Sequence, residues 1–541
     1  MSKISLLAIF LGSTAVGVAD PVLTSWYTEK SAALARVIQT TSTSTGTTIN
    51  TTPVTTWPTS GVPNNNSGGA AQSVAVYADV QRIRYDGSWV YLNSSGLASY
   101  TMGPFLTNSS GLFGFWPLSQ NYTVKIPRSP GTPPTNKTVH AGGPIGLMVN
   151  GVVIYDLGDA FGFVQTANTP AVTGTDAMGQ TNATHPWWRD ALAVEVVTFD
   201  PGFAHQPGSN GQYHYHAEPK ALRYQLGDHM QATYDATNHT FSYTEEVSKL
   251  HHSPILGWAF DGLPIYGPYG YSSPLDSSSG VTRMRSGFVL RNGANGTTNL
   301  VSTGRTTLPR WAAIAEGLAT LANYSTKSQV NGDYVLTAAL YGPATTYQTS
   351  GPGGVTTYAL GRYIGDYDFL GDRGQIQGAA GAFDLDQYNG RTCVTPEFPQ
   401  GTYAYFVSID ASGAPAFPYM LGKQYYGTKT GTAQGVTVPS TGVTELFNAG
   451  GTNLQEVMSS PTVNPATGDV TITWSSVEGG SYQVEASNDL ATWTTLSASV
   501  PAASNAVLPA PTSVTTKTSV IETGAAIQPA NPKRFYRVKR N

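Results

Sequence analysis

Residues 211–216 read Gly-Gln-Tyr-His-Tyr-His, and this stretch decides most of what the sequence predicts. Successive side chains of a β-strand point to opposite faces. His214 and His216 would therefore share one face, and Tyr213 and Tyr215 the other. Two imidazoles on one face of a strand can bind a single metal ion. The motif predicts a strand with a tyrosine face and a histidine face that is a candidate metal site.

The surrounding sequence offers further ligands. All nine histidines lie between His140 and His252, and His205 precedes His214 by nine residues, across a Pro-Gly-Ser-Asn-Gly turn. Imidazoles suit Zn or Cu, whereas additional carboxylates favour Mn or Fe. A packed strand whose histidines hydrogen-bond to carboxylates or backbone remains an open alternative. The candidate metal ligands are His205, His214, His216, Asp200 and His252.

Asp261 is the candidate supporting residue for catalysis. It lies in the sequence Phe-Asp-Gly-Leu-Pro, residues 260–264, between hydrophobic neighbours. Asp-Gly is typical of turns, so one interpretation is an Asx turn that shapes the backbone. The other is a carboxylate that orients an imidazole or supports a metal-bound water.

The composition favours a mainly β protein. Only 11% of the residues are charged, compared with about 25% in typical domains, and there are 59 Gly and 35 Pro. Short apolar–polar alternations, such as Tyr122–Ile126, are separated by turn dipeptides such as Asp86-Gly87. Helical spacing occurs at Pro309–Tyr324, and a second helix is expected near residues 27–38. The predicted fold is a large β-rich central domain with a few helices, followed by a C-terminal β-sandwich.

The N-terminus has the features of a signal peptide. Lys3 precedes an apolar run over Ile4–Val18, and Gly17 and Ala19 are the small residues of a cleavage site before Asp20. No other stretch reaches the ~18 apolar residues of a membrane helix. The mature protein is therefore expected to be secreted or to reside in the cell envelope, in the periplasm or on the cell surface, without a membrane span.

The remaining chain divides by composition. Residues 20–73 form an N-terminal segment with a Thr-, Ser- and Asn-rich linker, residues 74–427 the central domain, and residues 428–460 a second linker. Residues 461–541 alternate at Val470–Trp474 and Tyr482–Ala486, which predicts a fibronectin type III-like β-sandwich. This module also resembles C-terminal modules of exported bacterial proteins, which implies a structural or surface-tethering role.

The central region resembles the YHYH-domain family. The resemblance is carried by GGPIGLMVNGVVIYDLGD (142–159), FDPGFAHQPGSNGQYHYH (199–216), LGWAFDGLPIYGPYGY (256–271), FDLDQYNGRTCVTPEFPQGTYAYF (383–406) and PAFPYMLGKQYYG (415–427). It implies an exported or envelope protein, without implying a reaction, and it supports the importance of Asp200, His205, His214, His216, Asp261 and Asp386. Residues 269–383 exceed what these motifs require and are interpreted as an insertion.

Two stretches indicate an internal repeat. Asp200 lies five residues before His205, as Asp386 lies five before Arg391, and Tyr-His-Tyr-His matches Tyr-Ala-Tyr-Phe at 403–406. If the copies are equivalent, the central domain has two related halves and only the first has the histidines. A coincidence of two similar β-turns is the alternative.

Acidic residues also cluster between positions 366 and 386. Oxygen-rich loops can bind calcium, but the spacing here does not match an EF-hand. A solvated, turn-rich loop is therefore the alternative. The residues considered for calcium are Asp366, Asp368, Asp372, Asp384 and Asp386.

Function is bounded but not identified by these features. The net charge of −4 gives no indication of nucleic-acid binding, and the single cysteine, Cys393, excludes an internal disulfide. We expect an exported metal-binding protein, with Zn or Cu favoured, whose site serves redox or hydrolytic chemistry on an unknown small molecule or only sequesters the metal. The alternative is a non-catalytic module that binds glycans or a surface partner through aromatic residues such as Trp187-Trp188.

Overall fold

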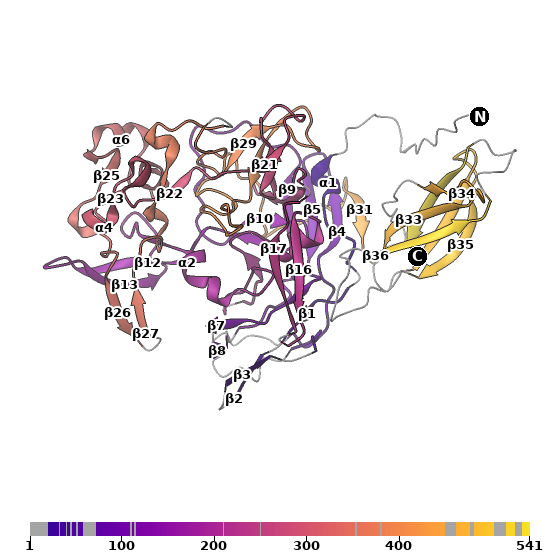
Figure 1. The fold of residues 1–541 in the computed structure, drawn as a ribbon, viewed down its shortest axis with the longest axis horizontal. Coiled ribbons are helices and arrows are strands. Elements are labelled where there is room, and N and C mark those ends of the chain that lie inside the picture. The colour runs from indigo at the N-terminus through magenta and orange to yellow at the C-terminus, as the bar shows by residue number, and fades with distance from the viewer. Residues whose placement is uncertain are drawn as a thin grey trace.

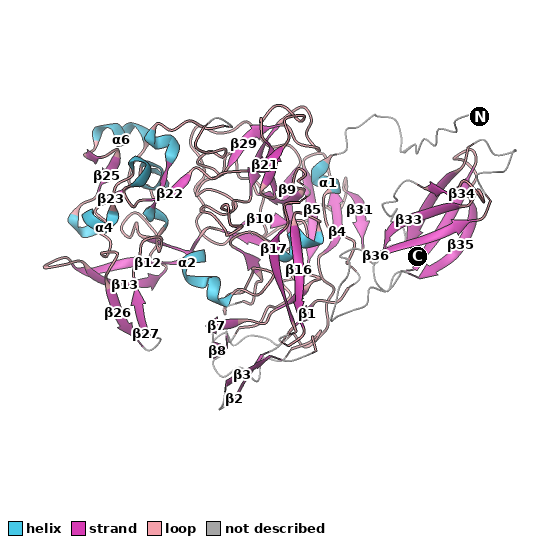
Figure 2. Ribbon diagram, in the orientation of Figure 1, coloured by secondary structure: helices cyan, strands magenta, loops and turns pink. Residues whose placement is uncertain are grey.

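The fold is mainly β, as the sequence predicts, in a computed structural model of the chain (Figures 1 and 2). It describes residues 20–449, except 32, 39, 44–45, 50–51, 58–71, 109–110, 113–114, 209, 238, 249, 352–353 and 379–380. Of the C-terminal part it describes residues 461–476, 481–501, 516–524 and 533–540. The predicted signal peptide lies outside the described residues. Within the described part of the chain, no helix has the length and apolar character needed to span a membrane.

A seven-stranded sheet forms the centre of the protein, in the order β15-β11-β10-β18-β19-β30-β29. Its middle strands are buried on both faces, and their side chains form the largest hydrophobic core. The strands are β10 (Pro144–Met148), β11 (Val153–Tyr155), β15 (His214–Tyr215), β18 (Ile255–Ala259), β19 (Pro264–Tyr266), β29 (Gly390–Cys393) and β30 (Thr402–Phe406).

This sheet has an internal twofold pseudosymmetry. The hairpin β10–β11 and the hairpin β18–β19 pair antiparallel through β10 and β18, with Leu147 opposite Trp258. Gly146 lies opposite Ala259, and Gly257 opposite Met148, so the register is the same in both directions. A Cβ atom on Gly146 would lie 2.7 Å from the Trp258 carbonyl oxygen, and one on Gly257 2.8 Å from that of Leu147. Both glycines are therefore required by the same close approach of two strands.

The pseudosymmetry extends to the outer strands. β15 pairs parallel with β11, and β30 pairs parallel with β19. Each outer strand then has an antiparallel neighbour: His205 bridges His214 in the first half, and Arg391 lies opposite Ala404 in the second. The structure thus shows the two related halves that the repeated sequence indicates.

The turn before each outer strand is also repeated. The Asp200 N–H donates to the Ala204 carbonyl oxygen at 2.9 Å, and the Asp386 N–H donates to that of Gly390 at 2.8 Å. Tyr213 donates its hydroxyl to Asp200 at 2.6 Å. The equivalent hydroxyl, that of Tyr403, donates to Asp386 at 2.8 Å. In both halves the first tyrosine of the motif therefore holds the aspartate of the preceding turn.

A second, four-stranded sheet packs next to the first, in the order β31-β4-β5-β9. β4 (Val80–Tyr85), β5 (Trp89–Ser94) and β9 (Tyr122–Pro127) come from the start of the predicted central domain. β31 (Thr444–Asn448) comes from residues 428–460, so part of the segment predicted as a linker is a strand. In the N-terminal segment, α1 (Pro21–Thr24) is followed by β1 (Arg36–Val37), β2 (Thr40–Thr43) and β3 (Gly46–Ile49), and the described residues of the range 27–38 form no helix.

The long crossovers of the two halves build a lobe of their own (Figure 1). It combines β12 (Gly158–Ala167), β13 (Thr173–Met178) and β14 (Trp188–Asp190) with elements of the predicted insertion, and its core joins Phe163 and Trp187 to Leu308 and Tyr363. Helical spacing over Pro309–Tyr324 predicts one helix, but the structure has two, α5 (Arg310–Ala315) and α6 (Leu321–Thr326). They are separated at Gly317, whose φ of 72° is incompatible with a continuous helix.

Strands and short helices from the insertion complete this lobe and its contact with the central sheet. They are β20 (Tyr269–Tyr271), β21 (Val281–Arg283), β22 (Phe288–Leu290), α4 (Leu300–Thr303), β23 (Thr307–Leu308), β24 (Gln329–Val330), β25 (Asp333–Val335), β26 (Gln348–Gly351), β27 (Gly354–Thr357) and β28 (Tyr367–Phe369).

The C-terminal residues form two three-stranded antiparallel sheets, β32-β33-β36 and β35-β34-β37. Trp474 is 1% exposed in the core between them and packs on Tyr482. This is the β-sandwich that the alternating sequence predicts. The strands are β32 (Thr462–Val463), β33 (Val470–Ser476), β34 (Ser481–Ser487), β35 (Thr494–Pro501), β36 (Thr516–Glu522) and β37 (Phe535–Arg540).

Candidate metal centre

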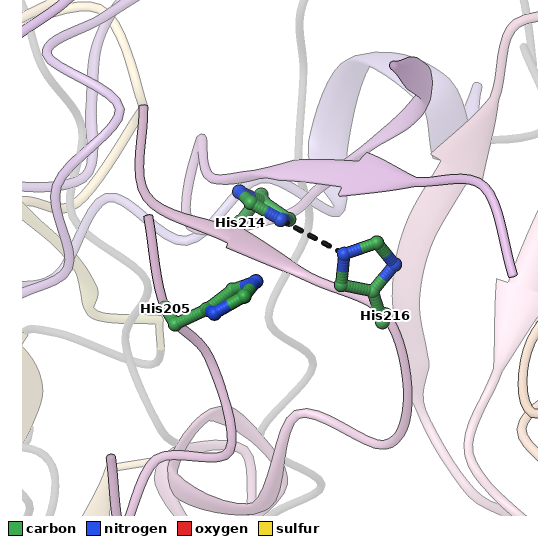
Figure 3. Close-up of side chains that lie close together, drawn as sticks. All are labelled: His205, His214 and His216. Atoms are coloured by element: carbon green, nitrogen blue, oxygen red, sulfur yellow. Dashed lines mark hydrogen bonds between the residues drawn. The ribbon is translucent and has the colours of Figure 1, made fainter. Parts of the chain in front are cut away.

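Three histidines meet at the outer edge of the first half. One nitrogen from each of His205, His214 and His216 lies within 4.8 Å of those of the other two. Figure 3 shows the three rings pointing toward one another. His214 is on β15, His216 directly follows this strand, and His205 is on the neighbouring segment that bridges His214. All three residues are at most 5% exposed. The strand alternation brings together three of the five predicted ligands.

Two of the three rings are oriented by backbone carbonyl groups. Nδ1 of His214 lies 2.8 Å from the carbonyl oxygen of Gln212, and Nδ1 of His216 lies 2.7 Å from that of Asp156. A carbonyl oxygen can only accept a hydrogen bond, so each Nδ1 must carry a proton and donate it. In the neutral rings Nε2 is then the unprotonated nitrogen, which is the form that ligates metals.

The third ring is oriented by a hydroxyl group. Nδ1 of His205 lies 2.7 Å from Oγ1 of Thr198. The Thr198 hydroxyl donates its own hydrogen to the carbonyl oxygen of Glu195 at 2.6 Å, so toward His205 it can only accept. All three rings therefore have a protonated Nδ1, held by an oxygen acceptor, and an Nε2 that contacts Glu195 or a neighbouring imidazole.

The Nε2 atoms approach closely. Those of His214 and His216 are 3.0 Å apart, although each Nδ1 already carries a proton. Burial and the neighbouring rings of His205 and His216 hold the pKa of His214 well below its usual range. Burial lowers the pKa of His216 too, but its contacts with Glu195 raise it overall. One shared proton on the Nε2 atoms explains this distance, and a cation could take the place of that proton.

Glu195 is a fourth candidate metal ligand, and it is not among the ligands predicted from the sequence. Its Oε2 lies 3.4 Å from Nε2 of His205 and 3.2 Å from Nε2 of His216. Burial raises the pKa of the carboxyl, but contacts with these two histidines hold it below its usual range. Its side chain is 27% exposed, whereas the three imidazoles are nearly inaccessible. Glu195 is the only glutamate between residues 142 and 216, which is the signal that could have identified it.

A short helix positions Glu195. α2 (Ala191–Glu195) begins after Asp190, whose carboxylate accepts a hydrogen bond from the Leu192 N–H at 2.9 Å. This is an ordinary N-cap, which stabilises the first turn. β14 precedes the helix and pairs with β12, so the lobe formed by the crossover fixes the position of the carboxylate.

Asp200, a predicted ligand, lies on the tyrosine side of the strand. It is 3% exposed and accepts hydrogen bonds from the Tyr213 hydroxyl at 2.6 Å and the Gly103 N–H at 2.9 Å. Burial raises the pKa of its carboxyl to about 7. The hydroxyls of Tyr213 and Tyr215 also meet that of Tyr100, at 2.9 and 2.6 Å. This network supports the strand from the face opposite the three imidazoles.

His252 and Asp261, the other two predicted site residues, lie in the second half. His252 packs against Tyr266, with ring centroids 5.0 Å apart. Asp261 accepts hydrogen bonds from the Tyr405 hydroxyl at 2.6 Å and the Leu263 N–H at 3.2 Å, the latter an Asx-turn contact. The structure therefore does not bring either residue to the three histidines. Asp261 is the pseudosymmetric equivalent of Asn150, whose amide contacts Tyr215.

The carboxylates considered for calcium do not share a common point. Within the described residues, the only group of metal-ligand side chains is that of the three histidines. The acidic residues are bonded to other side chains, so we do not propose calcium there. Their partners are Arg305 for Asp366, Arg373 for Asp368, Arg310 for Asp372, Arg285 for Asp384 and Tyr403 for Asp386.

Comparison with known families identifies the class of protein. Residues 123–420, more than half of the chain, match the family described as YHYH protein. The chain therefore belongs to the YHYH family. Searches of curated proteins and of solved structures found no match to this chain. The matched residues include both related halves and all four donors of the histidine–glutamate group.

Proposed function

We propose that this protein binds one divalent metal ion, with Zn or Cu favoured, through Nε2 of His205, His214 and His216. The observation that supports this most is the convergence of three Nε2 atoms whose Nδ1 partners are already fixed by oxygen acceptors. Metal-ligating histidines usually have such a partner on the second nitrogen, because it fixes the ring and its tautomer.

Glu195 makes the proposed site suitable for catalysis. Structural zinc sites are closed by four protein ligands, whereas catalytic sites keep a position that water or substrate can reach. Of the four side chains only that of Glu195 is partly exposed, at 27%, although its Oε2 beside the imidazoles is buried. Water or substrate could displace this carboxylate or use it as a base. A bound divalent ion lowers the pKa of a coordinated water to about 7. We therefore favour a metal-dependent enzyme that acts on a small molecule at the Glu195 side.

Metal content tests the proposal. The chain from Asp20 onward is compared with His214→Ala/His216→Ala and with His185→Ala/His239→Ala, which removes two histidines outside the group. After reconstitution and desalting, elemental mass spectrometry is expected to find about one equivalent of metal in the wild type and the control. The double variant in the motif should have almost none while keeping its far-ultraviolet circular dichroism. Equal metal content in all three proteins would contradict the proposal.

Location and the role of the C-terminal module are part of the same proposal. The apolar run at Ile4–Val18 favours export, and a site that collects metal outside the cytoplasm fits that location. The two-sheet C-terminal unit around Trp474 supports a fibronectin type III-like module that tethers or spaces the metal-binding domain. Immunoblotting of cytoplasmic, envelope and medium fractions for the full chain tests the location.

A further inference from the structure

The second half has different residues at the positions of the three histidines. The registers of the two halves place Arg391, Ala404 and Phe406 at the positions of His205, His214 and His216. The repeat keeps the tyrosines and the turn but exchanges three imidazoles for a cation and two apolar side chains. The second half therefore has no metal ligands at these three positions, and the Arg391 guanidinium gives it a positive charge there.

Arg391 is a buried cation that forms no ion pair with a carboxylate among the described residues, although Asp384 and the Cys393 thiol lie close enough to favour its charged form. It is 3% exposed, and its Nη2 donates to the carbonyl oxygen of Tyr271 at 2.5 Å. Its guanidinium lies 5.5 Å from the ring centroid of Phe406, and its Nε has no hydrogen-bond partner. The buried guanidinium groups of Arg223 and Arg305, in contrast, bind carboxylates. Burying a charge is unfavourable unless it is paired, so an anion bound beside Arg391 would stabilise its guanidinium group.

His252 lies next to the same two residues that Arg391 contacts, Tyr271 and Phe406. Its ring centroid is 4.8 Å from that of Tyr271 and 6.2 Å from that of Phe406. Nδ1 lies 2.8 Å from the carbonyl oxygen of Ser253 and must donate to it, which leaves Nε2 as an acceptor. Nε2 has no partner, and the residue is only 8% exposed. Burial lowers the pKa of His252 to about 4, so the ring is neutral at pH 7.

We propose that Arg391 and His252 form a second, metal-independent binding site for a small α-hydroxycarboxylate. The carboxylate accepts from Nε of Arg391, since guanidinium groups and carboxylates match in charge and geometry. The hydroxyl group donates to Nε2 of His252, the unpartnered acceptor. A simple carboxylate satisfies only the arginine, and a neutral alcohol only the histidine. The two unpartnered atoms thus select a ligand that carries both groups.

Glycolate and acetate provide the test, because they differ in one hydroxyl group. Binding to the full chain from Asp20 onward is measured by isothermal titration at pH 7 with sodium chloride as the ionic-strength control. We expect glycolate to bind about five- to tenfold more tightly than acetate, the effect of one additional hydrogen bond. His252→Phe should reduce that ratio to about one, and Arg391→Met should abolish binding of both.

Two further proteins separate this site from the metal centre and from misfolding. His214→Ala/His216→Ala removes the proposed metal ligands and should leave glycolate binding unchanged. Arg391→Lys keeps the charge but has no Nε donor, and it should bind glycolate at least tenfold more weakly while keeping the wild-type circular dichroism. The proposal is overturned if the wild type does not bind glycolate, if acetate binds equally well, or if a folded Arg391 variant binds like the wild type.

Discussion

Removal of the tyrosine hydroxyl groups separates the architecture of the repeat from its chemistry. Tyr213→Phe deletes the 2.6 Å hydrogen bond to Asp200, and Tyr403→Phe deletes the equivalent 2.8 Å bond to Asp386. Both acceptors are buried carboxylates that lose one of their few donors. A hydrogen bond to a charged group contributes about 1.5–3 kcal/mol, so each variant should lose about 2 kcal/mol of unfolding free energy.

The assay for these variants is urea unfolding followed by tryptophan fluorescence at pH 8. Burial raises the pKa of Asp200 to about 7 and that of Asp386 to about 6, so both carboxylates are ionised at pH 8. Because the tyrosines point away from the imidazoles, metal content measured on the same samples should stay at the wild-type level. The reasoning is refuted if Tyr213→Phe loses metal without losing stability, or if only one of the two variants is destabilised.

Three other changes probe the account. Glu195→Gln should keep the metal, because three imidazoles remain, but weaken its binding by about 10–100-fold. Competition with a chelator measures this affinity, and an unchanged affinity would show that Glu195 is not a metal ligand. Burial raises the pKa of Glu316 from 4.5 to about 7, so its stabilising contribution is complete below its unfolded-state pKa and is lost as the pH rises through 7. That shift in pKa is worth about 3 kcal/mol of unfolding free energy. Glu316→Gln should therefore melt at the same temperature as the wild type at pH 4 and at a higher temperature than the wild type at pH 8. Equal melting temperatures of the two proteins at both pH values would contradict the raised pKa of Glu316. Gly146→Ala and Gly257→Ala should each destabilise the protein by about 1–3 kcal/mol, since the added Cβ would meet a backbone oxygen of the facing strand. Urea unfolding measures this loss, and a loss of stability in only one of the two variants would contradict the equivalence of the halves.

The sequence predicted the part of the site that depends on local geometry. The alternation of Tyr213 to His216 requires only the two-residue period of a strand, and His205 follows from a short turn that leads back to the same strand. The repeat was also recognisable, because its tyrosines and turn aspartates are kept in both halves. These features are fixed by contacts between residues that are near in sequence.

The remaining features depend on contacts that the sequence pattern does not encode. Glu195 reaches the site because a crossover lobe positions α2, and the position of that lobe is a matter of tertiary packing. Asp200 is close to the histidines in sequence, but its turn directs the carboxylate to Tyr213 on the other face. The helical spacing after Pro309 continues through Gly317, where the backbone turns instead. Proximity along the chain therefore identified the region but not the complete donor set.

The most direct test of the central claim is anomalous diffraction from crystals of the protein reconstituted with zinc or copper. Data collected above and below the absorption edge of the metal locate the ion independently of any assumed ligand. The account predicts one strong peak about 2.0–2.1 Å from Nε2 of each of His205, His214 and His216, with the Glu195 carboxylate beside it. A peak elsewhere, or no peak in crystals of metal-soaked protein, would contradict the assignment of the three histidines as metal ligands.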